Sequence, residues 1–258
     1  MNRDRTSRRR FLLLSSSLLG TGLFGAAACG ATSAAKTATT ETARDAGTES
    51  SPKQAPRKTA TESDASTTID KVTYKVDTDD PVVFLTIDDG VTRDPDMADI
   101  LEENDLKATL FLTDQYVRQD PDFFRGLRDR TGSRIENHTL DHPDLSTKSF
   151  DEQLRQIGET SDHYQQVFGH RPTLMRPPYG NFNDDTLRAA QESGVKHVVH
   201  WTAVIDQGAI QFAADDHLTS GDIVLMHFTE HFREDVERFV AEAQQSGLEP
   251  ALLEGYLN

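Results

Sequence analysis

Two aspartates, Asp88 and Asp89, follow an apolar run at residues 82–87 and precede Gly90. Such a run is typical of a buried strand, and neighbours on a regular strand point to opposite faces. Because Gly90 favours a turn, we expect the backbone to leave the strand there, so that both carboxylates face one cavity. One carboxylate can then bind a divalent metal while the other acts as a base. Taken alone, these residues also fit a solvated Asp-Asp-Gly turn.

Two histidines, His138 and His142, occur further along in the segment HTLDHP at residues 138–143. Both imidazoles can reach one point if this loop forms a single helical turn, which Pro143 would end. Together with Asp89, two neutral imidazoles leave coordination positions open for water and substrate. The ligand set suits Zn²⁺, Fe²⁺, Mn²⁺ or Co²⁺, of which we expect Zn²⁺. A histidine pair at this spacing also occurs by accident, so the aspartates are what make it informative.

A competing zinc pattern, HxxEH, lies at residues 227–231, where His227 and His231 would both bind the metal of an inverted zinc protease. That arrangement requires a helix through the whole pattern. We disfavour it, because residues 223–226 form a strand-like apolar run that ends at His227, and no further ligand is evident downstream.

Short apolar runs alternate with amphipathic stretches from about residue 71 to the end of the chain. This alternation predicts a parallel sheet, in which functional side chains gather at the carboxyl ends of the strands. Asp88, Asp89 and His227 would all lie there. The expected strands cover residues 82–87, 108–112, 195–201 and 223–226. The expected helices include residues 97–101, 150–168 after a Ser149 capping box with Glu152, 187–190 after an Asn183 cap, and 236–243 before Gly247.

The first 28 residues resemble an export signal. Arginines precede an apolar stretch at residues 11–23, and the segment SRRRFL at residues 7–12 resembles a twin-arginine signal. Cys29, the only cysteine, follows small residues as in a bacterial lipobox. We therefore expect a lipid anchor at Cys29, on the outer face of the cytoplasmic membrane and facing the cell wall. The alternative is an uncleaved membrane anchor, which the short, interrupted apolar stretch disfavours.

The remaining sequence divides into a linker and a domain. Residues 29–70 are rich in Thr, Ala and Ser, so we expect a disordered tether, and residues 71–258 then form one catalytic domain. Removing the +4 formal charge of residues 1–28 from the net −16 of the chain leaves −20 for the remainder. A surface this acidic disfavours nucleic acid as a partner. We expect the protein to act as a monomer.

Four segments in order, TIDDG, HTLDHP, RPPYG and LMH, carry a resemblance to a known family. With them the chain resembles the polysaccharide deacetylases of carbohydrate esterase family 4, which share the NodB homology domain. The resemblance extends over residues 80–258. It implies an α/β fold, a distorted (β/α) barrel, and a metal-dependent N-deacetylase that acts on an N-acetylated polysaccharide.

The resemblance also implies a role for each matching residue. Asp89, His138 and His142 would hold the metal, and Asp88 would be the general base. Arg176 would orient that base and keep its pKa low. The backbone N–H of Tyr179 would stabilise the oxyanion, and His227 would be the general acid. Leu225 would form the wall of the acetyl-methyl pocket, and Trp201 would line the sugar groove.

Several positions depart from the family pattern. Ile87, Val91 and Phe228 replace the commoner Phe, Pro and Asp. The motif that usually supplies an Asp and a Trp is altered more, because here Trp201 is followed by Asp206 at a changed spacing. We assign Asp206 to orient and tune His227.

The membrane anchor and the tether indicate peptidoglycan as the substrate, since a tethered enzyme meets the wall first. Chitin-like polymers, poly-N-acetylglucosamine and acetylxylan are alternatives with the same chemistry. An alternative of another class is a lipoprotein that binds glycan without turnover, which predicts that the acid or the base is missing.

Overall fold

The structure is a computed structural model that describes residue 69 and residues 72–257. The expected signal (1–28), the lipid attachment site Cys29 and nearly all of the expected tether (29–70) lie outside the described residues, so these assignments stay predictions. Within the described part of the chain, no helix has the length and apolar character needed to cross a membrane.

The domain is built on one curled sheet of nine strands in the order β5-β4-β3-β2-β1-β8-β6-β7, with β9 paired to β1. Every pairing is parallel except the β6–β7 hairpin. The strands are β1 (Val82–Asp89), β2 (Thr109–Leu112), β3 (Arg134–Asn137), β4 (Leu174–Met175), β5 (His197–Val198), β6 (Ala203–Asp206), β7 (Ala209–Phe212), β8 (Ile223–His227) and β9 (Glu249–Ala251).

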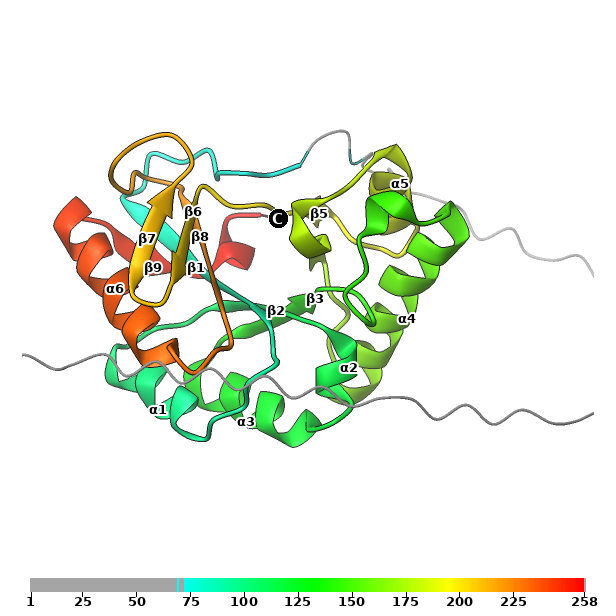
Figure 1. Ribbon diagram of the computed structural model, residues 1–258, viewed down its shortest axis with the longest axis horizontal. Helices are drawn as coiled ribbons and strands as arrows, with labels where there is room; N and C mark the ends of the chain where they lie inside the picture. The colour runs from blue at the N-terminus through cyan, green and yellow to red at the C-terminus, as the bar shows by residue number, and fades with distance from the viewer. Residues whose placement is uncertain (1–68, 70–71, 258) are drawn as a thin grey trace, which may run out of the picture. The chain divides into compact units, whose positions relative to one another are not determined.

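Helices surround the outside of this sheet, as Figure 1 shows. The curled, mainly parallel sheet with outer helices confirms the predicted distorted (β/α) barrel. The helices are α1 (Asp96–Glu103), α2 (Asp114–Val117), α3 (Pro121–Thr131), α4 (Phe150–Phe168), α5 (Asp184–Glu192) and α6 (Phe232–Ser246), with short 3₁₀ turns at Leu145–Thr147, Pro178–Gly180 and Leu253–Gly255.

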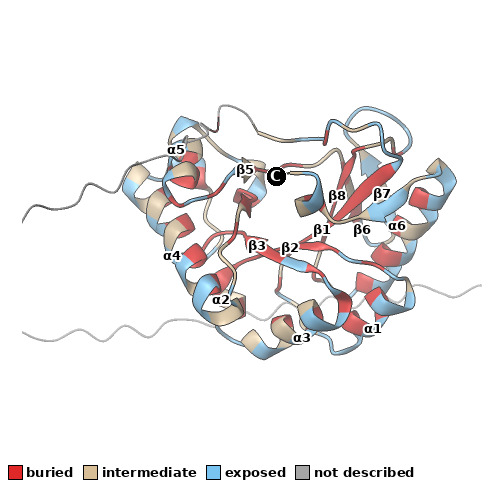
Figure 2. Cartoon of the chain, turned by 180° about the vertical axis from the view of Figure 1, so that it is seen from behind, coloured by how far each residue is buried: buried red, intermediate tan, exposed pale blue. Residues whose placement is uncertain are grey.

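The alternation of side chains along β1 divides the strand between two environments. Its outward face joins the core beneath α1, α3 and α6, whereas its inward face lines the barrel interior with Phe111 and Leu253. The burial pattern in Figure 2 follows the same division, with buried residues along the strands and on the inner sides of the helices. The outward residues are Val83, Leu85 and Ile87, and the inward ones are Phe84, Thr86 and Asp88.

Helix ends follow the local sequence signals. Ser149 caps α4 by accepting a hydrogen bond from the Glu152 N–H (3.4 Å), but the Glu152 carboxylate pairs with Arg155 (2.7 Å). The expected capping box is therefore only half formed. In α5, Asn183 and Thr186 form a complete capping box.

One predicted strand is shorter than expected. Residues 195–201 form only the two-residue β5, because the chain leaves β4 after Val198. Val199 forms a parallel bridge to Thr73 instead. The end of β5 therefore pairs with a segment that precedes β1.

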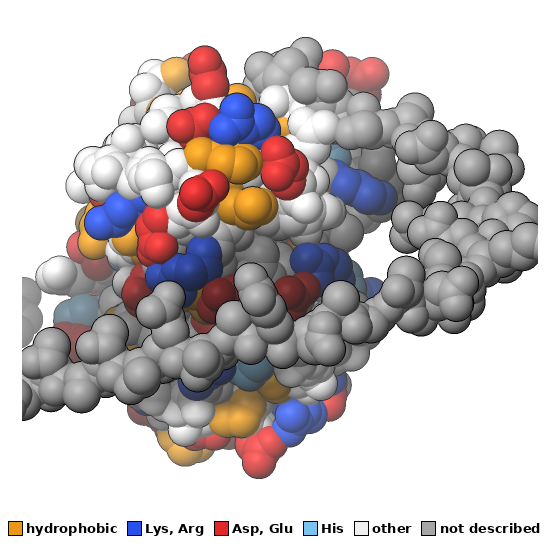
Figure 3. Space-filling model, turned by 90° about the vertical axis from the view of Figure 1, so that its right-hand side faces the viewer, with side chains coloured by type: hydrophobic (Ala, Val, Ile, Leu, Met, Phe, Trp, Pro, Cys, Tyr) orange, Lys and Arg blue, Asp and Glu red, His pale blue; other side chains and the backbone are white. Residues whose placement is uncertain are grey.

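Charged side chains of both signs are mixed on the side of the domain that carries α4 and α5, as Figure 3 shows. Many pair within one helix, including Arg155 with Glu152 (2.7 Å) and Arg188 with Asp185 (3.2 Å). Exposed pairs of this kind each contribute at most about 1 kcal/mol. The stability of this side therefore rests on the apolar contacts between α4 and α5.

Gly221 is required where the segment before β1 crosses the barrel. Its φ is +84°, and an added Cβ would lie 2.0 Å from the Val76 carbonyl oxygen. We expect Gly221→Ala to lower the free energy of unfolding by about 3 kcal/mol, because left-handed strain and a backbone clash add. Gly169→Ala, at φ +71° with no atom within 4 Å, should cost only about 1 kcal/mol. Urea denaturation measures both, and equal losses would contradict this account.

The buried carboxyl group of Glu254 should make the free energy of unfolding depend on pH. Burial raises its pKa to about 7, Glu136 adds to the shift, and its Oε1 is buried without a hydrogen-bond partner among the described residues. Because this folded-state pKa exceeds the unfolded value of about 4.3, stability falls as pH rises between the two. Glu254→Gln should be more stable than wild type at pH 8, by up to about 3 kcal/mol, with little difference near pH 4.

Thermal melts between pH 4 and pH 8 test this expectation. The matched control is Glu249→Gln, which changes an exposed residue on β9. A stability difference for Glu254→Gln that does not change with pH would show that the carboxyl group does not titrate in this range.

Candidate active site and metal centre

Asp88 and Asp89 end β1 at the carboxyl edge of the sheet. Asp89 has a φ of 78° and Gly90 a φ of 93°, so the backbone turns sharply there. Both carboxylates consequently line one cavity, which confirms the expected turn. Gly90 is needed for packing as well, because an added Cβ would lie 2.7 Å from the Phe124 ring.

His138 and His142 lie on the loop after β3, and this loop is not the helical turn that we predicted. Thr139 and His142 have φ values of 72° and 59°, which no helix contains. The Asn137 side chain accepts a hydrogen bond from the Thr139 N–H (2.8 Å), and the Thr139 hydroxyl accepts one from the His142 N–H (3.2 Å). Side-chain hydrogen bonds, not helical ones, therefore shape the loop.

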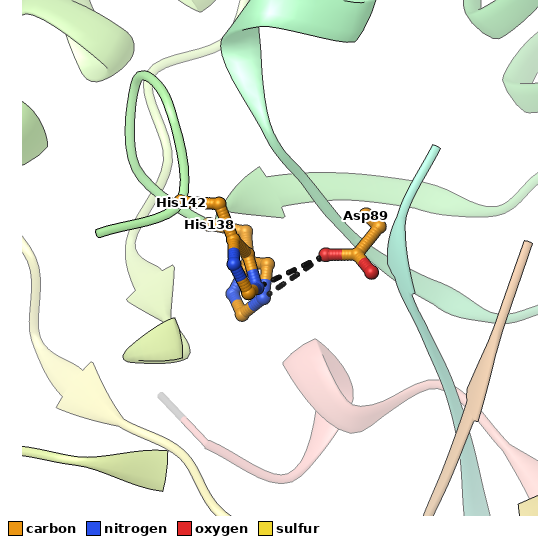
Figure 4. Close-up of side chains that lie close together, drawn as sticks. All are labelled: Asp89, His138 and His142. Atoms are coloured by element: carbon orange, nitrogen blue, oxygen red, sulfur yellow. Dashed lines mark ion pairs between the residues drawn. The ribbon is translucent and has the colours of Figure 1, made fainter. Parts of the chain in front are cut away.

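The two imidazoles nevertheless meet Asp89 at one point. Asp89 Oδ1 lies 3.5 Å from His138 Nε2 and 3.2 Å from His142 Nε2. Figure 4 shows these two contacts, with both rings directed at the carboxylate. Among the described residues, these three are the group whose donor atoms all lie within 4.8 Å of one another.

The donor set fits a divalent metal. Two ligand atoms bound at about 2.0 Å with a tetrahedral angle between them lie roughly 3.3 Å apart, close to the observed separations. Asp89 Oδ1 is buried and has no hydrogen-bond partner in the described part of the chain. Such an orphaned carboxylate oxygen beside two imidazoles is what a metal site requires.

His138 is prepared to act as a ligand. Its Nδ1–H donates to the Arg176 carbonyl oxygen (2.7 Å), which leaves the Nε2 lone pair directed at Asp89. Burial lowers the pKa of His138 to about 3, so the ring is neutral. Only a neutral imidazole can bind a metal.

Asp88 forms a buried ion pair with Arg176, at 2.7 Å between Oδ1 and Nη1. The same Nη1 donates to the Thr86 hydroxyl (2.8 Å), and Nη2 donates to the His200 carbonyl (3.0 Å). Burial raises the pKa of Asp88 above its ordinary value, and Arg176 opposes that shift. The low pKa that we expected from the ion pair is therefore wrong in sign, because desolvation outweighs it.

The cavity around these residues has a volume of about 360 Å³. His227 enters from β8, where it pairs in register with Asp88. Trp201 and Leu225 also line the cavity, and their roles in a sugar groove and an acetyl-methyl pocket stay predictions. The remaining lining residues are Asp89, His138, His142, Pro177, Tyr179 and Val204.

Tyr179 lies at the mouth of this cavity, 65% exposed and with a φ of 60°. Its ring meets the His142 ring edge to face at 4.6 Å. The backbone N–H of Tyr179 donates to none of the described residues, whereas Gly180 and Asn181 donate back to Pro177 and Pro178. This N–H is free to bind an oxyanion.

The predicted contact between Asp206 and His227 is not seen in the described part of the chain. Asp206 is exposed at the end of β6, and no hydrogen bond or ion pair joins it to His227 among the residues described. Burial raises the pKa of Asp235, and the negative charge of Asp206 adds to that shift. Asp206 is the last residue of β6, beside the turn at residues 207–208, and it does not line the cavity. The role assigned to it therefore stays a prediction.

Val204 is a cavity residue that we did not predict. It pairs in register with Leu225 on β8, so their side chains adjoin in the cavity. The signal was present in the sequence, since short runs rich in apolar residues lie on both sides of Gln207-Gly208. Both turn residues have positive φ, which is typical of a two-residue hairpin turn.

The competing zinc-protease pattern is wrong. Helix α6 begins at Phe232, so no helix runs through residues 227–231. His231 lies at the start of α6, where its Nδ1 is 3.4 Å from Glu234. His227 and His231 therefore do not form one metal site.

Known proteins are similar to this chain in sequence and in fold. Residues 75–198 match the family model for polysaccharide deacetylases. An uncharacterised protein of Streptomyces coelicolor is 37% identical over 204 residues, which cover 77% of this chain and 82% of that protein. A peptidoglycan-N-acetylglucosamine deacetylase of Bacillus cereus is 30% identical over 157 residues, covering 57% of this chain and 56% of that protein.

The fold is shared with a solved peptidoglycan N-acetylglucosamine deacetylase at a TM-score of 0.65 and 23% identity, over 72% of this chain and 92% of that one. At this identity the likeness concerns the fold alone. The sequence matches and the four ordered motifs identify the relationship. This chain belongs to the polysaccharide deacetylase family.

Proposed function

We propose that this protein is a metal-dependent N-deacetylase that removes acetyl groups from N-acetyl sugars of a cell-surface polysaccharide, and that this polysaccharide is peptidoglycan. One observation carries the proposal. A single cavity holds the ligand triad Asp89, His138 and His142, the carboxylate of Asp88, and His227 on the neighbouring strand.

A divalent metal on the triad would supply Lewis-acid polarisation of the acetamide carbonyl and a lowered pKa for water, and Zn²⁺ is the ion that we propose. Co²⁺, Mn²⁺ and Fe²⁺ suit the same ligands. Asp88 accepts a proton from the attacking water. Because Arg176 holds Asp88 from the barrel interior, the carboxylate keeps one orientation while it does so.

The remaining steps fall to residues on the other sides of the cavity. The Tyr179 N–H stabilises the negative charge that develops on the carbonyl oxygen. His227 donates a proton to the sugar nitrogen as the carbon–nitrogen bond breaks, so that acetate and a free amine leave. Leu225 and Val204 face the acetyl methyl group, and Trp201 faces the sugar.

The choice of peptidoglycan is supported by the Bacillus cereus relative, whose name states that substrate, and by the export signal expected at residues 1–28. Surface attachment through Cys29 belongs to the same proposal and rests on the sequence alone. Chitin-like polymers, poly-N-acetylglucosamine and acetylxylan are the alternative substrates.

The non-catalytic alternative predicts that the acid or the base is missing. Asp88, Arg176 and His227 are all present, with the first two joined at 2.7 Å. Their presence favours the enzyme over a glycan-binding lipoprotein.

Asp88→Asn should reduce kcat by about 10²- to 10⁴-fold, because the amide keeps the shape of the carboxylate but cannot accept the proton. Metal content should not change, since Asp88 is outside the triad. Acetate release from N-acetylglucosamine oligomers and from purified peptidoglycan is the measurement. Asp141→Asn, an exposed residue of the same ligand loop, is the matched control. Equal acetate rates for wild type and Asp88→Asn would refute the mechanism, and glycan binding without any acetate release would favour the non-catalytic alternative.

His142→Ala should weaken metal binding by roughly 100-fold or more, because it removes a direct ligand where outer partners alone contribute 10- to 100-fold. His231→Ala, in the rejected HxxEH pattern, should bind metal like the wild type. Metal content by mass spectrometry, and calorimetric titration of chelator-stripped protein with Zn²⁺, Co²⁺, Mn²⁺ and Fe²⁺, measure this. Loss of metal in His231→Ala with retention in His142→Ala would reverse the ligand assignment.

A further inference from the structure

A short segment before β1, residues 72–76, crosses between two parts of the sheet that do not pair with each other. We call it the strap, and it appears in cyan in Figure 1. The Thr73 N–H donates to the Val198 carbonyl (2.8 Å), and the Thr73 carbonyl accepts from the His200 N–H (2.7 Å). The N–H of Val76, the last residue of the strap, donates to the Gly221 carbonyl (2.9 Å). The strap therefore joins the end of β5 to the turn before β8.

The strap also contacts the aromatic wall of the active site. The Tyr74 ring packs on the His200 ring at 4.6 Å between centroids. His200 is stacked in turn on Trp201, at 5.1 Å and an interplanar angle of 10°. Trp201 lines the catalytic cavity. A continuous stack of rings thus runs from the strap to the cavity wall.

Packing against neighbouring rings and a hydrogen bond with the Gly180 backbone hold the His200 ring in this stack. His200 is only 8% exposed, and its Nε2 has no hydrogen-bond partner among the described residues. Phe182 contacts the ring edge-on at 5.5 Å. On another side is Gly180, where an added Cβ would lie 3.0 Å from both His200 and Trp201. Removing the Tyr74 ring would open the one side of His200 that the strap covers.

We propose that Tyr74 is a positioning residue for Trp201, so that the strap forms part of the active-site wall. Tyr74 precedes residue 75, where the family match begins, and it is 47% exposed. It has no contact with the ligand triad or with Asp88. Its effect passes through His200 to Trp201, and it concerns how the sugar is held, not the proton transfers. The role in sugar binding rests on the proposed function, whereas the position of the Trp201 ring does not.

Trp201 is the only tryptophan of the chain, so its fluorescence reports this stack directly. In the substrate-free full-length protein, Tyr74→Ala should shift Trp201 emission to longer wavelength and increase its quenching by acrylamide. Tyr74→Phe, which keeps the ring, should restore both values. Tyr256→Ala is the control, since that ring packs on Phe84 elsewhere in the barrel.

In kinetics with N-acetylglucosamine oligomers, Tyr74→Ala should raise KM by roughly 2- to 10-fold, the effect of one aromatic contact, and leave kcat within about twofold. Thermal melts compare the stability of the variants. If Tyr74→Ala does not fold, Tyr74→Leu keeps the bulk without the ring and replaces Tyr74→Ala in every assay.

Unchanged emission and quenching in the variant without the ring would overturn the proposal, as would a fall in kcat with KM unchanged. If neither the wild type nor any variant releases acetate, the proposed function fails. The fluorescence result still decides the role of Tyr74 in that case.

Discussion

The active site depends on one arginine buried inside the barrel. Arg176 is fully buried, and its guanidinium lies over the Phe111 ring at 4.4 Å. An isolated buried cation would cost several kcal/mol, so its donors must all find acceptors. They find them in Asp88, Thr86 and two backbone carbonyls. The same residue holds His138 through its own carbonyl oxygen, so one residue aligns both the base and a metal ligand.

The catalytic groups occupy the inward positions of strands whose outward positions form the main core. On β8, Val224 and Met226 belong to the core beneath the helices, whereas Leu225 and His227 line the cavity. A shift of register by one residue would bury the catalytic side chains beneath the helices. Packing of the outer core therefore fixes which side chains reach the substrate.

Much of this arrangement follows from local sequence patterns. The apolar run before Asp88 predicted β1. Gly90 predicted the change of backbone direction that places the carboxylates of Asp88 and Asp89 in one cavity. Convergence of His138 and His142 on Asp89 was predicted as well, although by the wrong backbone route. Their loop is shaped by hydrogen bonds between side chains and backbone, which leave no periodic signal in a sequence.

The failures share a different cause, which is contact between distant segments. The β6–β7 hairpin brings Val204 into the cavity and gives Asp206 no contact with His227 among the described residues, and its place against β8 depends on pairing across the sheet. Desolvation of Asp88 was missed for the same reason, since burial results from the whole barrel. The strap, too, has no pattern in its own sequence that would place Tyr74 beside His200.

Backbone strain at the site carries a cost of its own. Asp89, Thr139, His142 and Tyr179 all have positive φ, a conformation that costs a non-glycine residue roughly 1–3 kcal/mol. Glycine would relieve each position, but it would delete two ligand side chains, a loop-shaping hydroxyl and an aromatic ring. The strained residues of the active site therefore lower the free energy of unfolding of the barrel. Selection for thermal stability alone would favour glycine at these positions, and the protein would then lose the side chains on which its activity depends.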